Sequence, residues 1–327
     1  MKELGANMFN VLLLSAGRRV ELAQAFSEEI KKRGLKAKLL ATEMRPEVSA
    51  ACQVADLAIK APSVTSLGYI DFLLETCISN QIGLVIPTID TELVLLSQHR
   101  AAFAAEGIHL VISDQALVLD CRDKRKTAGL FHRLGIDTPR IFDRQAIQFP
   151  CFAKPYDGSC SIGATVVTDA TMLSHAILTD PKIMFMEFIN TFHQEYTVDA
   201  YYDRQGQLRC FIPRQRIETR AGEVSKGVTR RNMVYDYLHD KLNLLQGARG
   251  CITLQLFSQP ETGHFAALEI NPRFGGGFPL SYAAGGNYPG WLIDEYLLGQ
   301  SISFYEDWEP DLLMLRYDAK ILVNGYS

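Results

Sequence analysis

The sequence predicts an α/β domain with a parallel, doubly wound sheet, followed by an α+β unit built largely from antiparallel strands. Up to about residue 113, short β-rich apolar runs alternate with helical stretches, which is typical of a parallel sheet. Beyond residue 114, expected strands far outnumber helices, which favours antiparallel sheets. The 327 residues suffice for two or three domains, and we expect them over 1–113 and 114–327.

The individual elements follow from hydrophobic periodicity and from breaker residues. In the first part, strands are expected at 11–14, 37–41, 84–86 and 109–112, and helices at 20–33, 67–80 and 92–105. In the second part, helices are expected at 123–134 and 235–246, and strands at 151–154, 164–168, 183–186, 195–201, 208–213, 251–257 and 265–270.

Composition excludes several classes of protein. The net charge is −4 and Lys and Arg are scattered, so nothing indicates a nucleic-acid partner. The longest apolar runs fall far short of the roughly 20 residues that span a bilayer, and no signal peptide opens the chain. Seven widely spaced cysteines without a CxxC pair indicate reduced core residues. We therefore expect a cytoplasmic protein without a membrane partner.

Two places in the first domain are candidates for ligand contact. The turn Ser15–Gly17 follows the first strand, where nucleotide-binding folds place a phosphate, but the sequence lacks GxGxxG. Thr88, Asp90 and Glu92 follow another strand, at the side of an open sheet where ligands bind. The same residues could instead cap the next helix, with Asp90 as N-cap and Glu92 in the first turn. Both interpretations stay open at this stage.

The segment around residue 270 predicts a metal site. Alternation places Glu269, Asn271 and Arg273 on one face of a strand, and Gln255 lies on the preceding strand. Carboxylate and carboxamide oxygens suit Mg²⁺, which completes its shell with substrate phosphates. Either strand alone could simply be half-buried with a polar face, but their combination points to a metal–nucleotide.

A glycine-rich loop between two expected strands predicts a phosphate contact. Its small residues allow backbone N–H groups to close on phosphate oxygens, although such a loop can also be a plain hairpin turn. The loop positions are Gly158, Ser159, Ser161 and Gly163. Lys154, just before the loop, could place a charge on the same phosphates. Lys124 opens a helix, where a cation fits poorly unless an anion is near.

An apolar run interrupted by one acid predicts a slot for a nucleotide base. Glu187, Phe188 and Ile189 could supply the backbone groups at its edge, and Glu195 could accept hydrogen bonds from ribose hydroxyls. Without its context, the run is an ordinary core strand followed by a turn.

Taken in order along the chain, these motifs resemble the ATP-grasp superfamily. The resemblance rests on Asp123-Lys124, Phe152-Ala153-Lys154-Pro155, Gly158 to Gly163, Met186 to Ile189, Glu195, Gln255 and Glu269 to Arg273. The chain looks most similar to the synthetase unit of the carbamoyl phosphate synthase large chain and to single-unit carboxylate–amine ligases. The preceding βαβ region resembles the pre-ATP-grasp domain of those proteins.

The resemblance implies a role for each matched position. Lys124 and Lys154 would hold ATP phosphates under a mobile lid that includes Gly158–Gly163 and a subdomain over about 136–190. Glu187–Ile189 would read adenine, and Glu195 would bind ribose. The ions, Mg²⁺ or Mn²⁺, would be held by Gln255, Glu269 and Asn271, and Arg273 would stabilise the transferred phosphoryl group. Many relatives carry an acidic residue in place of Gln255, which leaves the number of ions open.

The resemblance further implies a ligase that converts a small-molecule carboxylate to an acyl phosphate and joins it to an amine. A kinase acting on a hydroxyl and a non-catalytic ATP-binding sensor are the alternatives. Selectivity is expected between the first domain, around Ser15–Arg19 and Thr88–Glu92, and the stretch Arg216–Arg231 together with the Gly275–Gly277 turn. Arg216, Lys226, Arg230 and Arg231 lie either in a solvated loop or beside the site. The oligomeric state stays open, with a homodimer as one candidate.

Overall fold

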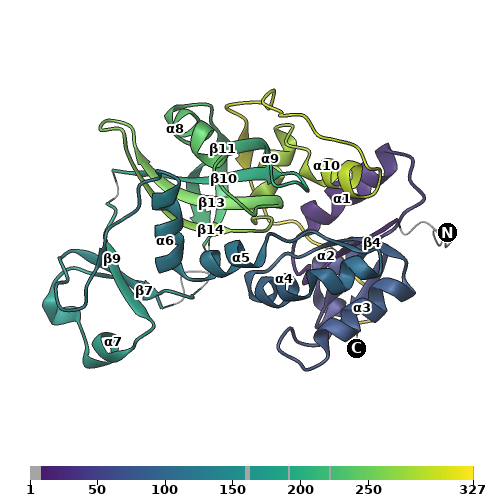
Figure 1. Cartoon of the computed structure of the whole chain (residues 1–327), viewed down its shortest axis with the longest axis horizontal. Helices are drawn as coiled ribbons and strands as arrows, with labels where there is room; N and C mark the ends of the chain where they lie inside the picture. Colours follow the sequence, from purple (N-terminus) through teal and green to yellow (C-terminus); the bar gives the residue numbers. More distant parts are fainter. Residues whose placement is uncertain (1–8, 159–162, 191, 221, 327) are drawn as a thin grey trace.

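The computed structural model describes residues 9–158, 163–190, 192–220 and 222–326. Within these residues, three sheets of five, four and six strands make up the framework. In Figure 1 the five-stranded sheet and its helices form one lobe, the four-stranded sheet forms a second, and the six-stranded sheet lies above and between them. The candidate site residues lie where these three parts meet.

The first sheet is parallel, with strand order β3-β2-β1-β4-β5. Its strands are β1 (Asn10–Leu13), β2 (Leu39–Glu43), β3 (Leu57–Lys60), β4 (Ile82–Ile86) and β5 (His109–Leu110). Its helices are α1 (Val20–Lys32), α2 (Ala50–Val54), α3 (Tyr69–Ser79) and α4 (Asp90–Ala105), with a 3-10 turn η1 at Pro46–Val48. The predicted doubly wound sheet is confirmed.

Both faces of this sheet are buried, which explains the uninterrupted apolar run in β1. Val11 and Leu13 pack with α1 in one core, and Leu12 packs with α3 and α4 in the other. The strands are added on one side of β1 up to β3 and on its other side from β4 on, and because all of them are parallel, the carboxyl ends of β1 and β4 lie side by side. Edge strand β3 was not expected from the sequence, because its largely exposed residues give no periodic signal.

The four-stranded sheet is antiparallel, with order β6-β9-β7-β8. Its strands are β6 (Ile141–Phe142), β7 (Cys151–Pro155), β8 (Thr165–Val167) and β9 (Ile183–Glu187), accompanied by η2 (Ala170–Met172) and α7 (His175–Thr179). A separate small core of Cys151, Ala153, Val167 and Phe185 holds it together. This core gives the sheet little anchoring to the rest of the chain.

The six-stranded sheet is antiparallel, with order β14-β13-β10-β11-β12-β15. Its strands are β10 (Gln194–Tyr202), β11 (Leu208–Arg220), β12 (Glu223–Thr229), β13 (Gly250–Gln259), β14 (His264–Asn271) and β15 (Leu313–Leu315). The solvated-loop interpretation of residues 216–231 was wrong for most of that stretch, because β11 and β12 pair there. The outer end of β11 is exposed, so its sequence resembles a loop.

Five more helices complete the described chain: α5 (Gln115–Arg122), α6 (Lys124–Arg133), α8 (Met233–Leu242), α9 (Phe278–Ala283) and α10 (Tyr288–Tyr296). Helices α1 and α10 pack together, and Arg33 binds both carboxylate oxygens of Asp294 at 2.6 Å, which fixes the first domain against the large sheet. None of the helices in the described residues is long and apolar enough to cross a membrane.

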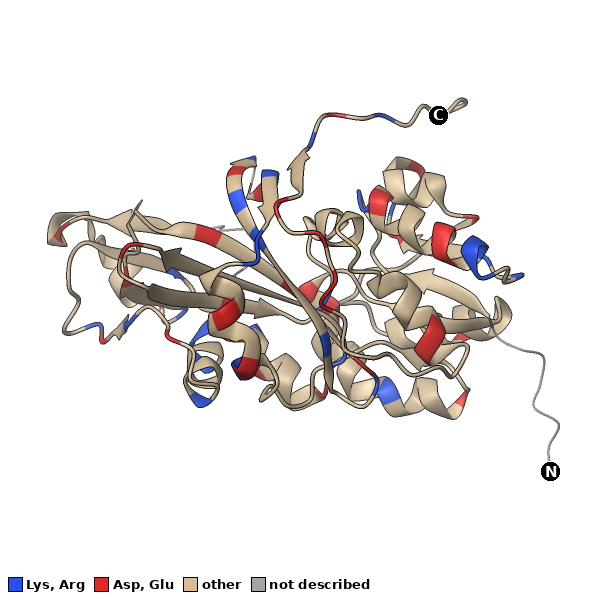
Figure 2. Ribbon diagram, turned by 90° about the horizontal axis from the view of Figure 1, so that it is seen from above, with Lys and Arg blue, Asp and Glu red and all other residues tan. Residues whose placement is uncertain are grey.

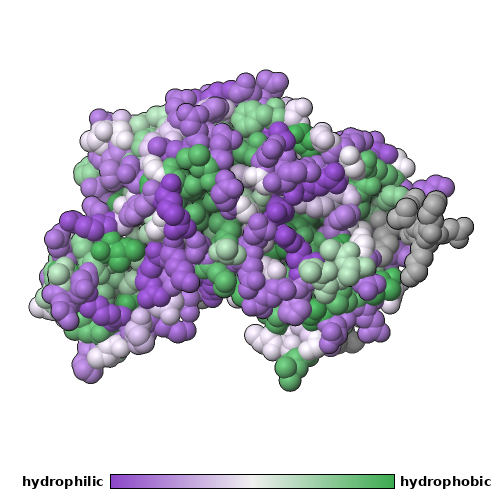
Figure 3. Space-filling model, in the orientation of Figure 1, coloured by the Kyte–Doolittle hydropathy of each residue, from purple (hydrophilic) through white to green (hydrophobic). Residues whose placement is uncertain are grey.

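Acidic and basic residues are interspersed along the ribbon in Figure 2. The space-filling view shows a hollow between the lobe with α7 and the lobe with α3 and α4 (Figure 3). The shape is that of two lobes bridged by the six-stranded sheet.

Candidate active site

A cavity of about 740 Å³ is lined by residues from the two antiparallel sheets and from helices and connections, including those of the first domain. Of the predicted site residues that the structure describes, all but Gly163 line it: Lys124, Lys154, Gly158, Glu187, Phe188, Ile189, Glu195, Gln255, Glu269, Asn271 and Arg273. Residues far apart in sequence are therefore brought to one place. Ser159 and Ser161 lie outside the described residues.

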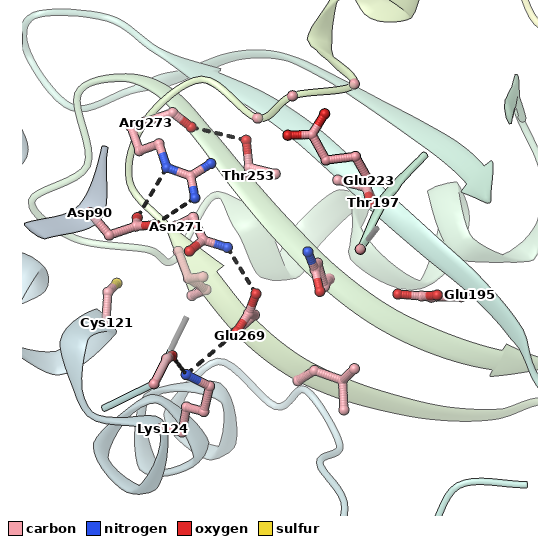
Figure 4. A pocket seen from close by; sticks show the side chains of 18 of the residues that line it. Asp90, Cys121, Lys124, Glu195, Thr197, Glu223, Thr253, Glu269, Asn271 and Arg273 are labelled. Atoms are coloured by element: carbon pink, nitrogen blue, oxygen red, sulfur yellow. Dashed lines mark hydrogen bonds and ion pairs between the residues drawn. The ribbon is translucent and has the colours of Figure 1, made fainter. Parts of the chain in front are cut away.

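The predicted metal ligands share one face of the six-stranded sheet. Gln255 pairs with Glu269 across β13 and β14, and with Thr197 across β13 and β10. Strand alternation puts Asn271 one step along on the same face as Glu269. In Figure 4, Glu269 and Asn271 point toward each other, and Asn271 Nδ2 donates to Glu269 Oε1 over 3.2 Å.

This donor set fits one Mg²⁺. Glu269 supplies a carboxylate, Gln255 and Asn271 can supply carboxamide oxygens, and phosphate and water oxygens would complete the shell. No cluster of three or more His, Cys, Asp or Glu side chains occurs among the described residues, so an all-protein cage of such ligands is absent from them. The site needs a ligand that brings its own oxygens.

Lys124 and Lys154 line the same cavity as the Glu269 carboxylate. Lys124 Nζ lies 3.7 Å from Glu269 Oε2 and donates to the carbonyl of Gly158 over 2.5 Å. Burial lowers the pKa of Lys154 to about 8, with Glu269 opposing and neighbouring Lys124 adding to the shift. Two cations in a half-buried site with one carboxylate leave positive charge unbalanced, as expected for a site that receives a polyanion.

The loop residues at either end of the glycine-rich segment pack on Pro155. A Cβ at Gly158 would lie 3.2 Å from Pro155 Cβ, and one at Gly163 would lie 3.3 Å from Pro155 Cγ. Gly163 also has φ of +73°, a conformation that favours glycine. The glycines thus fit the tight return between β7 and β8, and the phosphate contact stays a prediction.

The predicted base slot has the expected apolar walls. Phe152, Met186 and Phe257 line the cavity beside Phe188 and Ile189. The backbone N–H of Glu187 donates to the carbonyl of Arg140 at 2.8 Å, so this particular N–H is already occupied. Backbone groups of Phe188 and Ile189 are the better candidates for reading a base edge.

Glu195, the predicted ribose acceptor, is held by Arg216. Arg216 Nη1 donates to Glu195 Oε1 over 2.7 Å, and its Nη2 donates to the carbonyl of Gly222. Burial raises the pKa of Glu195, while Arg216 opposes that shift. Of the four basic residues left open by the sequence, Arg216 alone lines the cavity. Lys226 pairs with Glu218, Arg230 with Asp311, and Arg231 lies over the ring of Trp308.

Arg273 is oriented by Asp90. The Asp90 carboxylate accepts from Arg273 Nε at 3.1 Å and from Nη2 at 2.6 Å, as seen in Figure 4. The N-cap interpretation of Asp90 was wrong, since Ile89 holds that position and Asp90 begins α4. Asp90 and Arg273 are 183 positions apart, so no local sequence pattern indicates that they pair.

Glu92, in contrast, does stabilise the start of α4. Its Oε1 accepts from the N–H of Thr88 at 3.2 Å, and its Oε2 accepts from the hydroxyls of Ser15 and Tyr69 at 3.1 Å each. Burial raises the pKa of Glu92 to about 7. This carboxylate therefore ties the turn after β1 to the turn after β4 and does not face the cavity.

The charged cavity residues Arg214 and Glu223 were not singled out from the sequence, whereas Arg19 belongs to the predicted selectivity stretch. Arg19 donates to the carbonyl of Thr88 over 2.8 Å, and burial, with Arg273 nearby, lowers its pKa to about 10. Glu223 lies 2.8 Å from Arg18. Of the stretches expected to set selectivity, Thr88–Thr91 and Gly275–Gly277 line the cavity, whereas Ser15–Arg19 contributes Arg19 alone.

Comparisons with known proteins agree with this geometry. Residues 11–111 match a family model described as PylC-like, N-terminal domain. Residues 179–314 match one described as ATP-grasp in the biosynthetic pathway with Ter operon. No curated protein matches the sequence.

Solved structures of similar fold cover nearly the whole chain. A biotin carboxylase from Campylobacter jejuni has a TM-score of 0.72 and 17% identity, covering 93% of this chain and 74% of the other. N5-carboxyaminoimidazole synthetase from Staphylococcus aureus, complexed with ADP, has a TM-score of 0.67 and 14% identity, with coverage of 94% and 79%. L-amino acid ligase from Bacillus licheniformis has a TM-score of 0.63 and 17% identity, with coverage of 88% and 74%. At these identities the likeness establishes the fold.

Proposed function

We propose that this chain, a member of the ATP-grasp superfamily, is an ATP-dependent ligase that activates a carboxylate as an acyl phosphate and joins it to an amine. The observation that carries the proposal is that Lys124, Lys154 and Glu269 line one cavity, with Lys124 Nζ 3.7 Å from the Glu269 carboxylate. That arrangement provides a metal ligand and two cations for a triphosphate. Two of the structural neighbours are a synthetase and an amino acid ligase, which supports a bond-forming reaction.

In this proposal the chain binds and orients the nucleotide. Lys124 and Lys154 hold phosphate oxygens, Phe188 and Ile189 offer backbone groups to adenine, and Glu195 accepts from ribose hydroxyls. Gln255, Glu269 and Asn271 would hold Mg²⁺ or Mn²⁺, which when bound neutralises charge on the phosphates. Arg273, fixed by Asp90, stabilises the charge that develops during phosphoryl transfer.

The reaction has two steps. A substrate carboxylate oxygen attacks the γ-phosphorus of ATP, giving an acyl phosphate and ADP. The amine nitrogen then attacks the acyl carbon, phosphate leaves with the bonding electrons of the C–O bond, and the nitrogen loses a proton. Positioning and electrostatic stabilisation dominate such chemistry, so no protein nucleophile is required.

We further propose that the four-stranded sheet, within residues 136–190, is the lid of the nucleotide site, and that the first domain ends near residue 113. The small separate core of this sheet supports the first point. A closed lid would exclude water and protect the acyl phosphate. We propose that the partners are small molecules. A homodimer is the assembly to test by light scattering, because a structural neighbour, the biotin carboxylase domain of Hydrogenobacter thermophilus 2-oxoglutarate carboxylase, is a dimer.

The proposed function is tested by incubating the protein with ATP, Mg²⁺ and pools of carboxylic acids and amino acids. We expect ADP release that requires both an acid and an amine, together with an amide product detected by mass spectrometry. A phosphoester and ADP without need for an amine would indicate the kinase alternative. Nucleotide binding without ADP release from any pool would indicate the sensor.

A further inference from the structure

The side chain of Arg214 ends in a buried guanidinium whose two terminal nitrogens lack hydrogen-bond partners among the described residues. Its side chain is 1% exposed and its Nε donates to Oδ2 of the fully buried Asp199 over 2.8 Å. Neither Nη1 nor Nη2 has a hydrogen-bond partner among the described residues. Buried donors without partners are rare in folded proteins, and each one calls for an explanation.

The Asp199 carboxylate accepts its hydrogen bonds from groups other than Nη1 and Nη2 of Arg214. Its Oδ2 also accepts from Ser281 at 2.6 Å and its Oδ1 from Thr253 at 3.2 Å. The aspartate is thus satisfied by three side chains and holds Arg214 by one edge only. The opposite edge of the guanidinium, with both free nitrogens, is presented in a fixed orientation, and a planar pair of donors matches a carboxylate.

The register of the large sheet places Arg214 beside the proposed metal site. Arg214 on β11 is opposite Thr197, which is opposite Gln255, which is opposite Glu269. All four residues line the cavity. Neighbouring strands lie about 4.8 Å apart, so the Cα of Arg214 is about 10 Å from that of Gln255. This separation suits a small molecule with one end at the metal and the other at Arg214.

The Gly275–Gly277 turn covers the guanidinium and explains why glycine stands there. A Cβ at Gly277 would lie 2.3 Å from Arg214 Nη1 and 2.7 Å from Val224 Cγ1. The φ of Gly277 is −92°, so space and not backbone conformation requires glycine. Three consecutive glycines also let the turn move aside when a ligand approaches the nitrogens.

The charge of this end of the cavity also favours an anion. Arg19 lines the same wall and has no carboxylate within 4 Å among the described residues, while Asp90 and Asp199 already serve Arg273 and Arg214. Glu223, the remaining acid here, contacts Arg18 and Arg316.

We propose that Nη1 and Nη2 of Arg214 bind a carboxylate of the substrate that does not react, so that either the acid or the amine joined by the enzyme carries an additional carboxylate. This inference rests on the proposed function and narrows its substrate class. The two sources are a dicarboxylic acid and an amino acid.

The test is calorimetry on the full chain saturated with Mg²⁺ and the non-hydrolysable analogue AMPPNP. The titrants are matched pairs: dicarboxylic acids of three to six carbons against their monocarboxylic counterparts, and the common L-amino acids against their amides. In one of the two sets of pairs, we expect the ligand with the additional carboxylate to bind at least about tenfold more tightly than its counterpart. A hydrogen bond to a charged group contributes about this difference in affinity. The arm that responds identifies the source.

Variants then assign the preference to Arg214. Arg214→Gln should abolish the preference for the additional carboxylate, whereas Arg209→Gln should retain it. Arg209 is the matched control, because it lies on the same strand and also donates through Nε to a buried aspartate, Asp203, but does not line the cavity. Should Arg214→Gln fail to fold, Gly277→Ala, which displaces the guanidinium, should have the same effect on selectivity.

Equal binding within every pair, no binding of any titrant, or a preference that survives both Arg214→Gln and Gly277→Ala would overturn the inference while leaving the proposed function standing. Failure of AMPPNP itself to bind would instead contradict the proposed function.

Discussion

The Asp90 carboxylate binds the Arg273 guanidinium through two hydrogen bonds, of 3.1 and 2.6 Å, and so joins the first domain to the end of the metal-site strand. Both side chains are largely buried. The first domain therefore contributes a side chain to the candidate active site, and we propose that Asp90 positions Arg273.

Replacing Asp90 by Asn should lower kcat far more than it changes the KM for ATP. Asn presents an amide N–H to a donor of Arg273 and breaks the bidentate pairing, and misplacement by about 1 Å can cost on the order of 100-fold in rate. Steady-state ADP release measures both constants. Asp311→Asn, which breaks an exposed pair with Arg230, is the control and should leave kcat unchanged. An unaltered kcat in the Asp90 variant would remove this residue from the mechanism.

Glu92 should make the protein less stable as pH rises from about 4.5 to 7. Burial raises its pKa from 4.5 to about 7, so the folded state binds a proton that the unfolded state releases. The stabilisation is complete below pH 4.5 and is lost as pH rises through 7, by on the order of 3 kcal/mol.

Glu92→Gln should therefore flatten this part of the profile of unfolding free energy against pH. Urea unfolding at several pH values measures it, with Glu106→Gln, an exposed change at the other end of α4, as control. A Glu92→Gln profile parallel to the wild type would show that another group is responsible.

ATP binding should be accompanied by proton uptake at about pH 8.5. Burial and Lys124 lower the pKa of Lys154 to about 8, so part of the population is neutral there, and a bound polyanion restores the ammonium form. Affinity should consequently be full below pH 8 and decline above it. Calorimetry in buffers with different ionisation enthalpies reports the uptake. It should vanish in Lys154→Met and persist in Lys182→Met, a change of an exposed lysine. Equal uptake in both variants would contradict this assignment.

Glu269→Gln should raise the Mg²⁺ concentration needed for half-maximal activity and sharply lower turnover, while leaving the fold intact. The substitution removes the one carboxylate among the three proposed ligands. Magnesium titrations of ADP release measure the change, and thermal unfolding checks the fold. Glu261→Gln, at the exposed turn after β13, should behave like the wild type. Normal magnesium dependence in the Glu269 variant would exclude this carboxylate from the metal shell.

Local sequence patterns correctly predicted the features that depend on residues close together in the chain. Alternation in residues 268–273 correctly placed Glu269 and Asn271 on one face, and the βαβ succession gave the parallel sheet. Contacts across the fold were not predictable in this way. Arg214 was not singled out from the sequence, and its importance emerges from its pairing with Asp199 and its fit beneath Gly277.

Family-model matches over residues 11–111 and 179–314 confirm the superfamily resemblance. The sequence could predict it because seven weak motifs in a fixed order make a strong combined signal. The closer likeness to carbamoyl phosphate synthase stays a prediction, as do the individual residue roles.

The central claim, that Lys124, Lys154 and Glu269 act together on one metal–nucleotide, is tested most directly by calorimetric titration of Mg²⁺-loaded AMPPNP into the wild type and into the Lys124→Met/Lys154→Met variant. We expect one site per chain in the wild type and, at about 1.5 to 3 kcal/mol for each charged hydrogen bond, an affinity at least about 100-fold weaker in the double variant. No binding to the wild type, or equal affinity in a folded double variant, would contradict the account.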